Sequence, residues 1–233
     1  MLNASDALRE LRALGDPEDA RFLQRFFKTG QGEYGEGDVF LGIRVPATRQ
    51  LARKYRELPL SEIRKLLHAK EHEARLLALI LLTHQYQRAD HDLQQKIFGF
   101  YLAHTARINN WDLVDVSAPS IVGAHLYLRD KSLLDELALS TSLWERRIAI
   151  LATAYFIKRG EYAVTLRIAR RLLKDEHDLI HKAVGWMLRE VGNRDRDMLL
   201  GFLDRHYRAM PRTMLRYAIE KLEASRRAKY MAR

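Results

Sequence analysis

The stretch NNWDLVDVSAP, residues 109–119, places a tryptophan and two acids at the start of an expected helix. Trp111 and Asp115 are four residues apart, so they share one helical face. The face of a tryptophan ring and a carboxylate both stabilise a nearby cation. Breaking a glycosidic bond passes through such a cation, an oxocarbenium-like transition state. The stretch therefore indicates a site suited to positive charge that develops during a reaction.

Composition restricts the partners of this site. The 233 residues include 40 Lys and Arg against 30 Asp and Glu, which gives a net charge of +10. This balance favours a polyanionic partner, nucleic acid first and an acidic membrane second, although a merely soluble basic protein would share it. The absence of cysteine excludes disulfides, thiolate metal ligands and thiolate nucleophiles, and it suits a reducing cytoplasm.

No segment of the sequence predicts a membrane span. The longest apolar run, LLALILL at residues 76–82, is far too short to cross a bilayer. The first residues, MLNASDALRELRALGDPED, are charged throughout and lack the apolar core of a signal peptide. A soluble protein is expected.

The breaker residues divide the chain into helical stretches. Alternating β-branched runs are nearly absent, and Gly and Pro fall between segments of helical periodicity. Four of these segments start 36 residues apart: RLLALILL at Arg75, WDLVDVSA at Trp111, RIAILATA at Arg147 and AVGWMLRE at Ala183. Such a period predicts stacked helical hairpins. The expected fold is all-α, a solenoid of HEAT-like repeats in one domain over residues 1–233, with a basic tail at 224–233 as a tether or a frayed end.

The repeat register places four chemical side chains on one concave face: Trp111, Asp115, Arg147 and Trp186. An arginine adds a fork for phosphate to the two rings and the acid. Each residue also has an ordinary interpretation. The tryptophans could pack in the core, Asp115 could favour the positive end of its helix, and Arg147 could form a surface ion pair with Glu145. Their convergence favours a site.

Other chemistries find less support in the sequence. There is no HExxH motif and no apparent Ser-His-Asp set. His177 and His181 stand i,i+4 on a helix without an obvious third ligand, so two partly exposed polar residues are expected rather than a metal site. GQGEYG at residues 30–35 follows a helix instead of a strand, which favours a connector over a dinucleotide-binding loop. A single acid would suffice where the leaving base is already cationic, as an alkylated base is.

Four segments carry a resemblance to a known family: FLGIRVPATRQLA at residues 40–52, NNWDLVD at 109–115, LWERRIAI at 143–150 and HKAVGWMLREVG at 181–192. Over about residues 16–223 the chain resembles the bacterial DNA alkylation repair glycosylases of the HEAT-like-repeat type, the AlkD-like proteins. The resemblance implies a right-handed α-solenoid with a basic concave groove that hydrolyses the N-glycosidic bond of N3- and N7-alkylpurines in duplex DNA. It implies no metal or organic cofactor, a monomer, and a location on DNA in the bacterial cytoplasm.

The same resemblance suggests roles for individual residues. Asp115 corresponds to the catalytic carboxylate, Trp111 and Trp186 to the aromatic pair at the lesion, and Arg147 to a DNA-backbone contact. Phe26 stands where the family's glycosylases place a tyrosine, and a glycine-rich insertion, TGQGEYGEGD, follows it. Further phosphate contacts are expected from cations on or beside the in-phase helices or in the first third of the chain: Lys182, Arg189, Arg212, Arg216, Arg44 and Arg49.

Two other functions remain open. Some relatives bind DNA without glycosylase activity, and the phenylalanine and the insertion are compatible with that use. A helical solenoid also commonly serves as a protein-interaction surface. Release of the alkylated base would indicate the glycosylase. Salt-sensitive DNA binding without release would indicate the non-catalytic DNA-binding protein, and failure to bind DNA at low salt would indicate the protein-interaction surface.

Overall fold

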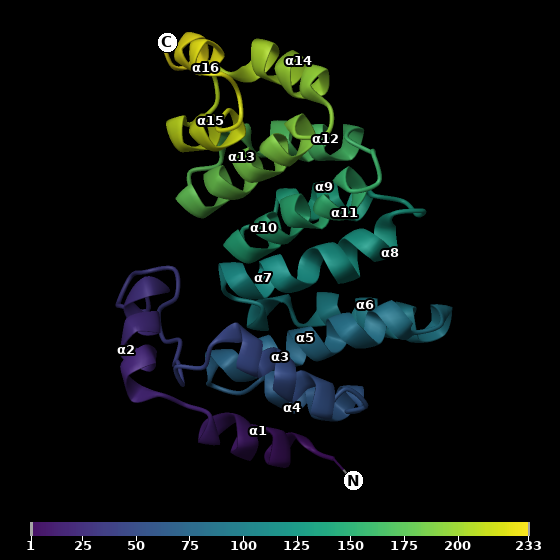
Figure 1. Cartoon of the computed structure of the whole chain (residues 1–233). Coiled ribbons are helices and arrows are strands. Elements are labelled where there is room, and N and C mark those ends of the chain that lie inside the picture. Colours follow the sequence, from purple (N-terminus) through teal and green to yellow (C-terminus); the bar gives the residue numbers. More distant parts are fainter. Residues whose placement is uncertain (1, 233) are drawn as a thin grey trace. The chain divides into compact units, whose positions relative to one another are not determined.

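The computed structural model describes residues 2–232, and within that range it is all-α (Figure 1). The described residues form no strand, and the only β-type pairing is an isolated parallel bridge between Val39 and Glu71. The expected fold class is therefore confirmed. The chain divides into two compact units, which meet in sequence between Ser117 and Ala118. The prediction of one domain over the whole chain stays a prediction.

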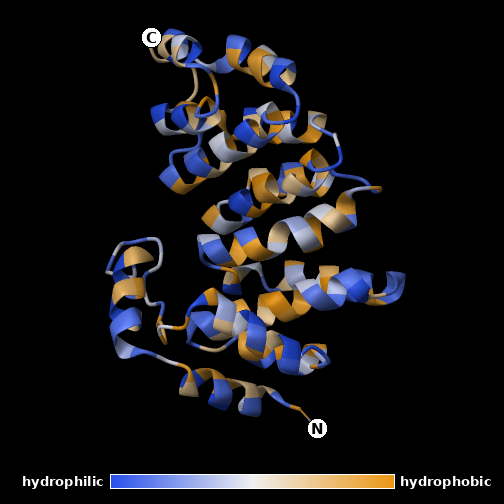
Figure 2. Cartoon of the chain, in the orientation of Figure 1, coloured by the Kyte–Doolittle hydropathy of each residue, from blue (hydrophilic) through white to orange (hydrophobic). Residues whose placement is uncertain are grey.

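The N-terminal unit, up to Ser117, contains eight helical elements: α1 (Ala4–Ala13), α2 (Pro17–Phe26), α3 (Val45–Lys54), α4 (Leu60–Leu67), α5 (His72–Arg88), α6 (His91–Ala103), the 3-10 turn η1 (Thr105–Arg107) and most of α7 (Trp111–Ala118). Helix α5 is central, since α1, α3, α4 and α6 all pack against it. Its residues are apolar around most of the circumference, and its middle turns are orange in Figure 2. A helix that is apolar on all sides belongs in a core.

Helix α2 differs from the other helices of this unit. It starts sharply, because the Asp16 carboxylate accepts the backbone N–H groups of Glu18 and Asp19 and Pro17 occupies the first turn. None of its ten residues is buried. The glycine-rich loop that follows returns the chain to the core. Within that loop Gly35 lies so close to the Phe27 carbonyl that an added Cβ would meet the oxygen at 2.5 Å, so the path requires glycine.

The C-terminal unit, from Ala118, contains the π-helical segment η2 (Pro119–Gly123), α8 (Ala124–Leu126), α9 (Ser132–Ala138), α10 (Leu143–Ala152), α11 (Ala154–Ile157), α12 (Ala163–Arg171), η3 (Leu172–Lys174), α13 (Asp178–Gly192), α14 (Arg196–His206), α15 (Arg212–Ala218) and α16 (Ala224–Met231). Helices α10, α13 and α15 pack in succession, while α9 and α12 cover α10 and α13. Stacked helical pairs of this kind are what the 36-residue period predicts.

The repeat register is correct for the core and less so for the surface. At the third place of the four segments Leu77, Leu113 and Ala149 are fully buried, as is Gly185. The first place was expected on an exposed face, yet Arg75, Arg147 and Ala183 are all buried there. Only Trp111 is partly exposed. The 36-residue period thus identifies equivalent positions in the repeats, but it does not predict which of these positions are exposed to solvent.

The basic C-terminal tail is helical instead of frayed over its described part. Helix α16 covers residues 224–231, and its Tyr230 is buried with the phenol donating to Asp204 Oδ1 at 2.8 Å. The Arg212 guanidinium donates to the Met231 carbonyl at 2.9 Å. Arg233 lies outside the described residues. These contacts attach the tail to the last helical pair.

Candidate nucleic-acid site

Trp111 is the first residue of α7 and lies against an aromatic cluster of the N-terminal unit. The Phe27 ring stacks on the indole, with centroids 4.9 Å apart and an angle of 15° between the planes. Phe26 meets the indole edge to face at 6.0 Å and 70°. Behind them Phe27 stacks on Phe40 at 4.8 Å, and Phe40 stacks on the His72 imidazole at 4.4 Å. One indole face is therefore packed, while the side chain as a whole stays partly exposed.

A buried ionic network holds the start of α7. The His72 imidazole lies between two carboxylates, with Nδ1 3.0 Å from Asp38 Oδ2 and Nε2 2.8 Å from Asp112 Oδ2. Arg75 donates to the other oxygen of Asp38, and the Asn110 amide donates to Asp38 Oδ2 at 3.2 Å. His72, Arg75 and Asn110 are each at most 2% exposed. Two positive and two negative groups thus form one neutral cluster that holds Asn110 and Asp112, the residues on either side of Trp111 in the sequence.

The protonation states follow from this geometry. Burial on its own lowers the pKa of His72, but the Asp112 charge and the hydrogen bonds that His72 donates to both carboxylates outweigh burial and raise that pKa to about 9. Burial would likewise raise the pKa of Asp38, yet the hydrogen bond from His72 and the charge of Arg75 lower it. The imidazolium is therefore the stable form at neutral pH. It donates one hydrogen bond to each carboxylate.

A second buried carboxylate fixes the loop that precedes α3. Glu73, next to His72 on α5, accepts the backbone N–H groups of Leu41, Gly42 and Ile43 at 2.9–3.1 Å. Gly42 has φ +84°, and a Cβ there would meet the Asp16 carbonyl at 2.0 Å, so only glycine fits. The first turn of α5 thereby fixes the last part of the chain between α2 and α3, from Asp38 to Ile43. Asp38, contributed by that connection, reaches the Trp111 helix as a result.

Asp115 lies one turn after Trp111 on α7, and its side chain is partly exposed. Its charge is felt by Tyr101: burial raises the pKa of that phenol above the ordinary range, the hydrogen bond with Ser117 lowers it, and the Asp115 charge adds to the increase. Trp111 and Asp115 thus lie one turn apart on α7 with both side chains partly exposed, and Phe26 contacts the Trp111 indole. That these residues form one site stays a prediction. The acid is not sealed in the core.

The other predicted site residues belong to the C-terminal unit. Trp186 is partly exposed on α13, and Lys182 and Arg189 lie one turn before and after it. Arg147 on α10 is 5% exposed, and its Nη1 donates to the Leu179 carbonyl of α13 at 2.7 Å. Arg147 is thus part of the packing between α10 and α13. Its role at a DNA backbone stays a prediction, as does its meeting with Trp111 and Asp115.

The predicted phosphate contacts fall into two groups. Four of them already hold protein partners: Arg44 pairs with Asp19, Lys182 with Asp178, Arg189 with Glu220, and Arg212 with the Met231 carbonyl. Arg49 and Arg216 are exposed and make no ion pair within residues 2–232. These two are the cations most available to an incoming anion.

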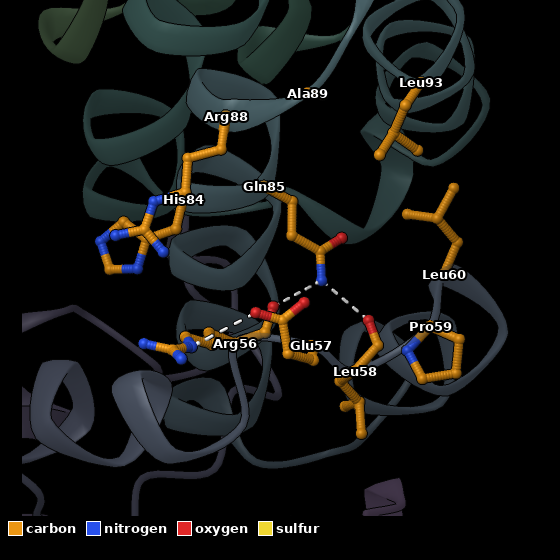
Figure 3. Close-up of a pocket in the computed structure, with 10 residues that line it drawn as sticks. All are labelled: Arg56, Glu57, Leu58, Pro59, Leu60, His84, Gln85, Arg88, Ala89 and Leu93. Carbon is orange, nitrogen blue, oxygen red and sulfur yellow. Dashed lines mark hydrogen bonds and ion pairs between the residues drawn. The ribbon is translucent and has the colours of Figure 1, made fainter.

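Arg49 belongs to a cationic patch beside a pocket of about 380 Å³ (Figure 3). Burial lowers the pKa of His84, and the charges of Arg88, Arg49 and Arg53 lower it further, so these groups lie within electrostatic reach of one another. In the pocket wall, the Gln85 amide donates hydrogen bonds to the carbonyls of Arg56 and Leu58 at 2.9 and 2.8 Å, so these polar groups already have partners within the protein. Among its described lining residues the pocket has no Phe, Tyr or Trp, and its one aromatic ring is that of His84. It fits a phosphate contact better than a reacting base.

Histidines 177 and 181 have structural partners. His177 caps α13 by accepting the Leu179 N–H at 3.1 Å, and the His181 imidazole contacts the Asp175 carbonyl. Within the described part of the chain no group of three or more His, Cys, Asp or Glu side chains is placed to hold a metal ion. Nor is any described helix both long and apolar enough to span a bilayer.

Sequence reasoning missed the ionic network of Asp38, His72, Arg75, Asn110 and Asp112, as well as Glu73. A signal was present, because the charged HEAR at residues 72–75 runs directly into the most apolar stretch of the chain. Ionisable residues at the buried end of an apolar helix must be paired. The partner residues Asp38 and Asp112 lie 34 and 40 positions from His72, so they could not be identified from spacing.

Residues 7–222 match the family described as DNA alkylation repair enzyme. No curated protein matches the chain. Among solved structures, one titled "Predicted DNA alkylation repair enzyme from Enterococcus faecalis" has a TM-score of 0.70 and 18% sequence identity, and the match covers 90% of this chain and 97% of that one. At this identity the likeness shows a shared fold.

Proposed function

Because the chain belongs to the DNA alkylation repair enzyme family, we propose that it is a monofunctional glycosylase. It hydrolyses the N-glycosidic bond of cationic N3- and N7-alkylpurines in duplex DNA and leaves an abasic site. The observation that carries the proposal is the start of α7. There a partly exposed acid, Asp115, follows a partly exposed indole, Trp111, by one helical turn on a firmly held helix.

The reaction needs charge stabilisation more than proton transfer to the leaving group. An alkylated purine carries a positive charge, so it departs as a neutral base when the bond to C1′ breaks with its electron pair. Positive charge then develops on the sugar. The Asp115 carboxylate stabilises that charge by Coulomb attraction, and the Trp111 face adds a cation–π contribution. Water adds to C1′ and loses its proton, for which Asp115 is the acceptor in reach.

Selectivity for damaged bases follows from the same arrangement. A neutral purine would have to be protonated as it leaves, and the proposed site supplies one carboxylate but no second acid. Alkylated bases are therefore released much faster than undamaged ones. Trp186 and Arg147 of the C-terminal unit are proposed to contact the same DNA, with a second indole and a guanidinium. That part of the proposal depends on the two units sharing one DNA ligand.

The runner-up is a DNA-binding protein without catalysis. It is favoured by Phe26, which supplies a ring but no hydroxyl at the position where the family's glycosylases place a tyrosine. Such a protein would keep the basic surface and the aromatic cluster, and it would recognise damaged or branched DNA. A protein-interaction surface is the third candidate.

One assay separates these functions. The protein is incubated with duplex DNA that contains N7-methylguanine, and both the freed base and the alkali-labile abasic sites are counted against an undamaged duplex. Release of methylated purine with an intact strand before alkali treatment supports the glycosylase. Salt-sensitive binding without release supports the runner-up. Failure to bind either duplex at low salt rejects both.

A further inference from the structure

Helix α2 exposes two aromatic rings on one face. Phe22 and Phe26, one helical turn apart, are 47% and 54% exposed. Their planes are inclined by 15° and their centroids are 6.1 Å apart, so they present one nearly continuous aromatic surface. The helix has no buried residue of its own. Scattered exposed apolar residues are ordinary, but two rings aligned on one helical face are the kind of patch that binds a partner.

The aromatic surface continues into the candidate site. Phe26 touches the Trp111 indole edge to face at 6.0 Å, so Phe22, Phe26 and Trp111 form one strip. The strip is anchored from behind by Phe27, which is buried and stacks on both Trp111 and Phe40. A ligand that lies on Trp111 can therefore extend onto α2 without leaving aromatic surface.

The charges around the strip indicate the chemistry of that ligand. Arg21, Arg25 and Lys28 are exposed on or just after α2 and form no ion pair within residues 2–232. The Arg44 guanidinium lies 5.8 Å from the Phe22 ring centroid while it pairs with Asp19. Exposed aromatic surface bordered by cations without an ion pair matches a strand of nucleic acid with an unstacked base. The base covers a ring and the backbone lies among the cations.

We propose that the strip Phe22–Phe26 is a stacking platform for an unpaired nucleobase of DNA bound at Trp111. The inference rests on the proposed DNA substrate, and it assigns α2 a function of its own. Phe26 has no hydroxyl with which to bind a phosphate, so its ring face is what it offers. Stacking is indifferent to base identity because every base has a π face. The platform thus adds affinity for locally unpaired DNA of any sequence.

The test compares two duplexes of identical length. One is fully paired, and the other carries a single base opposite a stable abasic analogue, so that this base is free to unstack. Wild-type protein is expected to prefer the second duplex. The double variant Phe22→Leu/Phe26→Leu keeps apolar side chains but removes the π faces. It is expected to lose about 5-fold or more of that preference and to bind the paired duplex within about twofold of wild type.

Matched variants make the result decisive. Phe26→Tyr keeps a ring and retains the preference, and Leu14→Ala, which removes an apolar side chain 48% exposed outside the strip, leaves both affinities unchanged. The platform is overturned if the double variant keeps the full preference, or if it weakens binding to both duplexes equally. Because binding is measured without base release, an inactive protein that shows the preference rejects the glycosylase alone. An active protein whose preference survives the double variant rejects the platform alone.

Discussion

The two units of the chain bury different kinds of groups. The N-terminal unit buries Asp38, His72, Glu73, Arg75 and Asn110 in connected hydrogen bonds next to Trp111. The described buried polar residues of the C-terminal unit are fewer, namely His125, Arg147, Thr153 and Thr165, and the stack of α10, α13 and α15 is apolar around them. The N-terminal unit thus adds a buried ionic network to its apolar core, whereas the stacked helices of the C-terminal unit pack mainly through apolar side chains.

The difference shows what each interaction is suited to. Buried ion pairs contribute little net stability, because desolvation offsets their attraction, but each accepts only particular partners in a particular geometry. Such specific pairing fixes the position of the loop that carries Asp38 next to the start of α7. Apolar helix faces associate with less directional preference, and they are enough to stack one helical pair on the next. The ionic network is accordingly found beside the candidate site.

Breaking the network should have the largest effect on stability. Arg75→Met removes a buried cation. The Asp38 carboxylate then keeps only one of its two positive partners, His72. The free energy of unfolding is expected to fall by about 3–5 kcal/mol. Chemical denaturation measures it, with Arg9→Met at an exposed pair as the control. A loss below 1 kcal/mol would mean that the network does not hold this unit together.

Raising the pH should weaken the same network without any mutation. The pKa of His72 is about 9 in the folded protein against about 6.5 in an unfolded chain, so the folded state binds the proton more tightly. This contribution, on the order of 3 kcal/mol, is complete below about pH 6.5 and is lost as the pH rises through 9. Denaturation at pH 6, 8 and 10 should show it. His72→Gln should flatten the difference, and equal pH slopes in both proteins would contradict the assignment.

The C-terminal unit should be sensitive to shape instead of charge. Gly185 on α13 faces α15, and a Cβ there would meet the Met214 carbonyl at 2.5 Å. Gly185→Ala is therefore expected to destabilise the protein by about 1–3 kcal/mol, because backbone must move. At Gly201 on α14 an added Cβ would meet only the end of the Arg205 side chain, at an ordinary contact distance of 3.6 Å. Gly201→Ala should therefore be neutral or slightly stabilising, since alanine is the better helix former. Calorimetry measures the stability of both variants, and an equal change in Gly185→Ala and Gly201→Ala would contradict the packing argument.

The smallest expected effect concerns the cationic patch of the N-terminal unit. Arg49→Gln/Arg53→Gln removes two exposed charges that make no ion pair within residues 2–232. If both contact phosphate, the slope of log affinity against log salt concentration should decrease by about 2. Arg9→Gln/Arg194→Gln, at cations already paired with Asp6 and Glu190, should leave the slope unchanged. An unaltered slope in Arg49→Gln/Arg53→Gln would mean that these two arginines do not contact the DNA backbone.

The sequence was informative where the evidence is local. Helical periodicity predicted the all-α class, and spacing on one helix placed Trp111 and Asp115 together with both partly exposed. The 36-residue register aligned Arg75 with Arg147 but could not tell that both are buried, since the register carries no information on what covers a position. Asp38 was missed for a related reason. Its contact with His72 spans 34 residues of chain, which include α3 and α4. Asp38 itself lies in a loop whose path depends on Gly35 and Gly42.

The central claim is that Asp115 stabilises the sugar cation during base release, and Asp115→Asn tests it most directly. Single-turnover release of N7-methylguanine from duplex DNA is measured with both proteins at saturating concentration, so that binding does not limit the rate. The account predicts that the variant binds the duplex as wild type does but releases the base on the order of 100- to 1,000-fold more slowly, because the amide carries no charge. Equal release rates for the two proteins would contradict it.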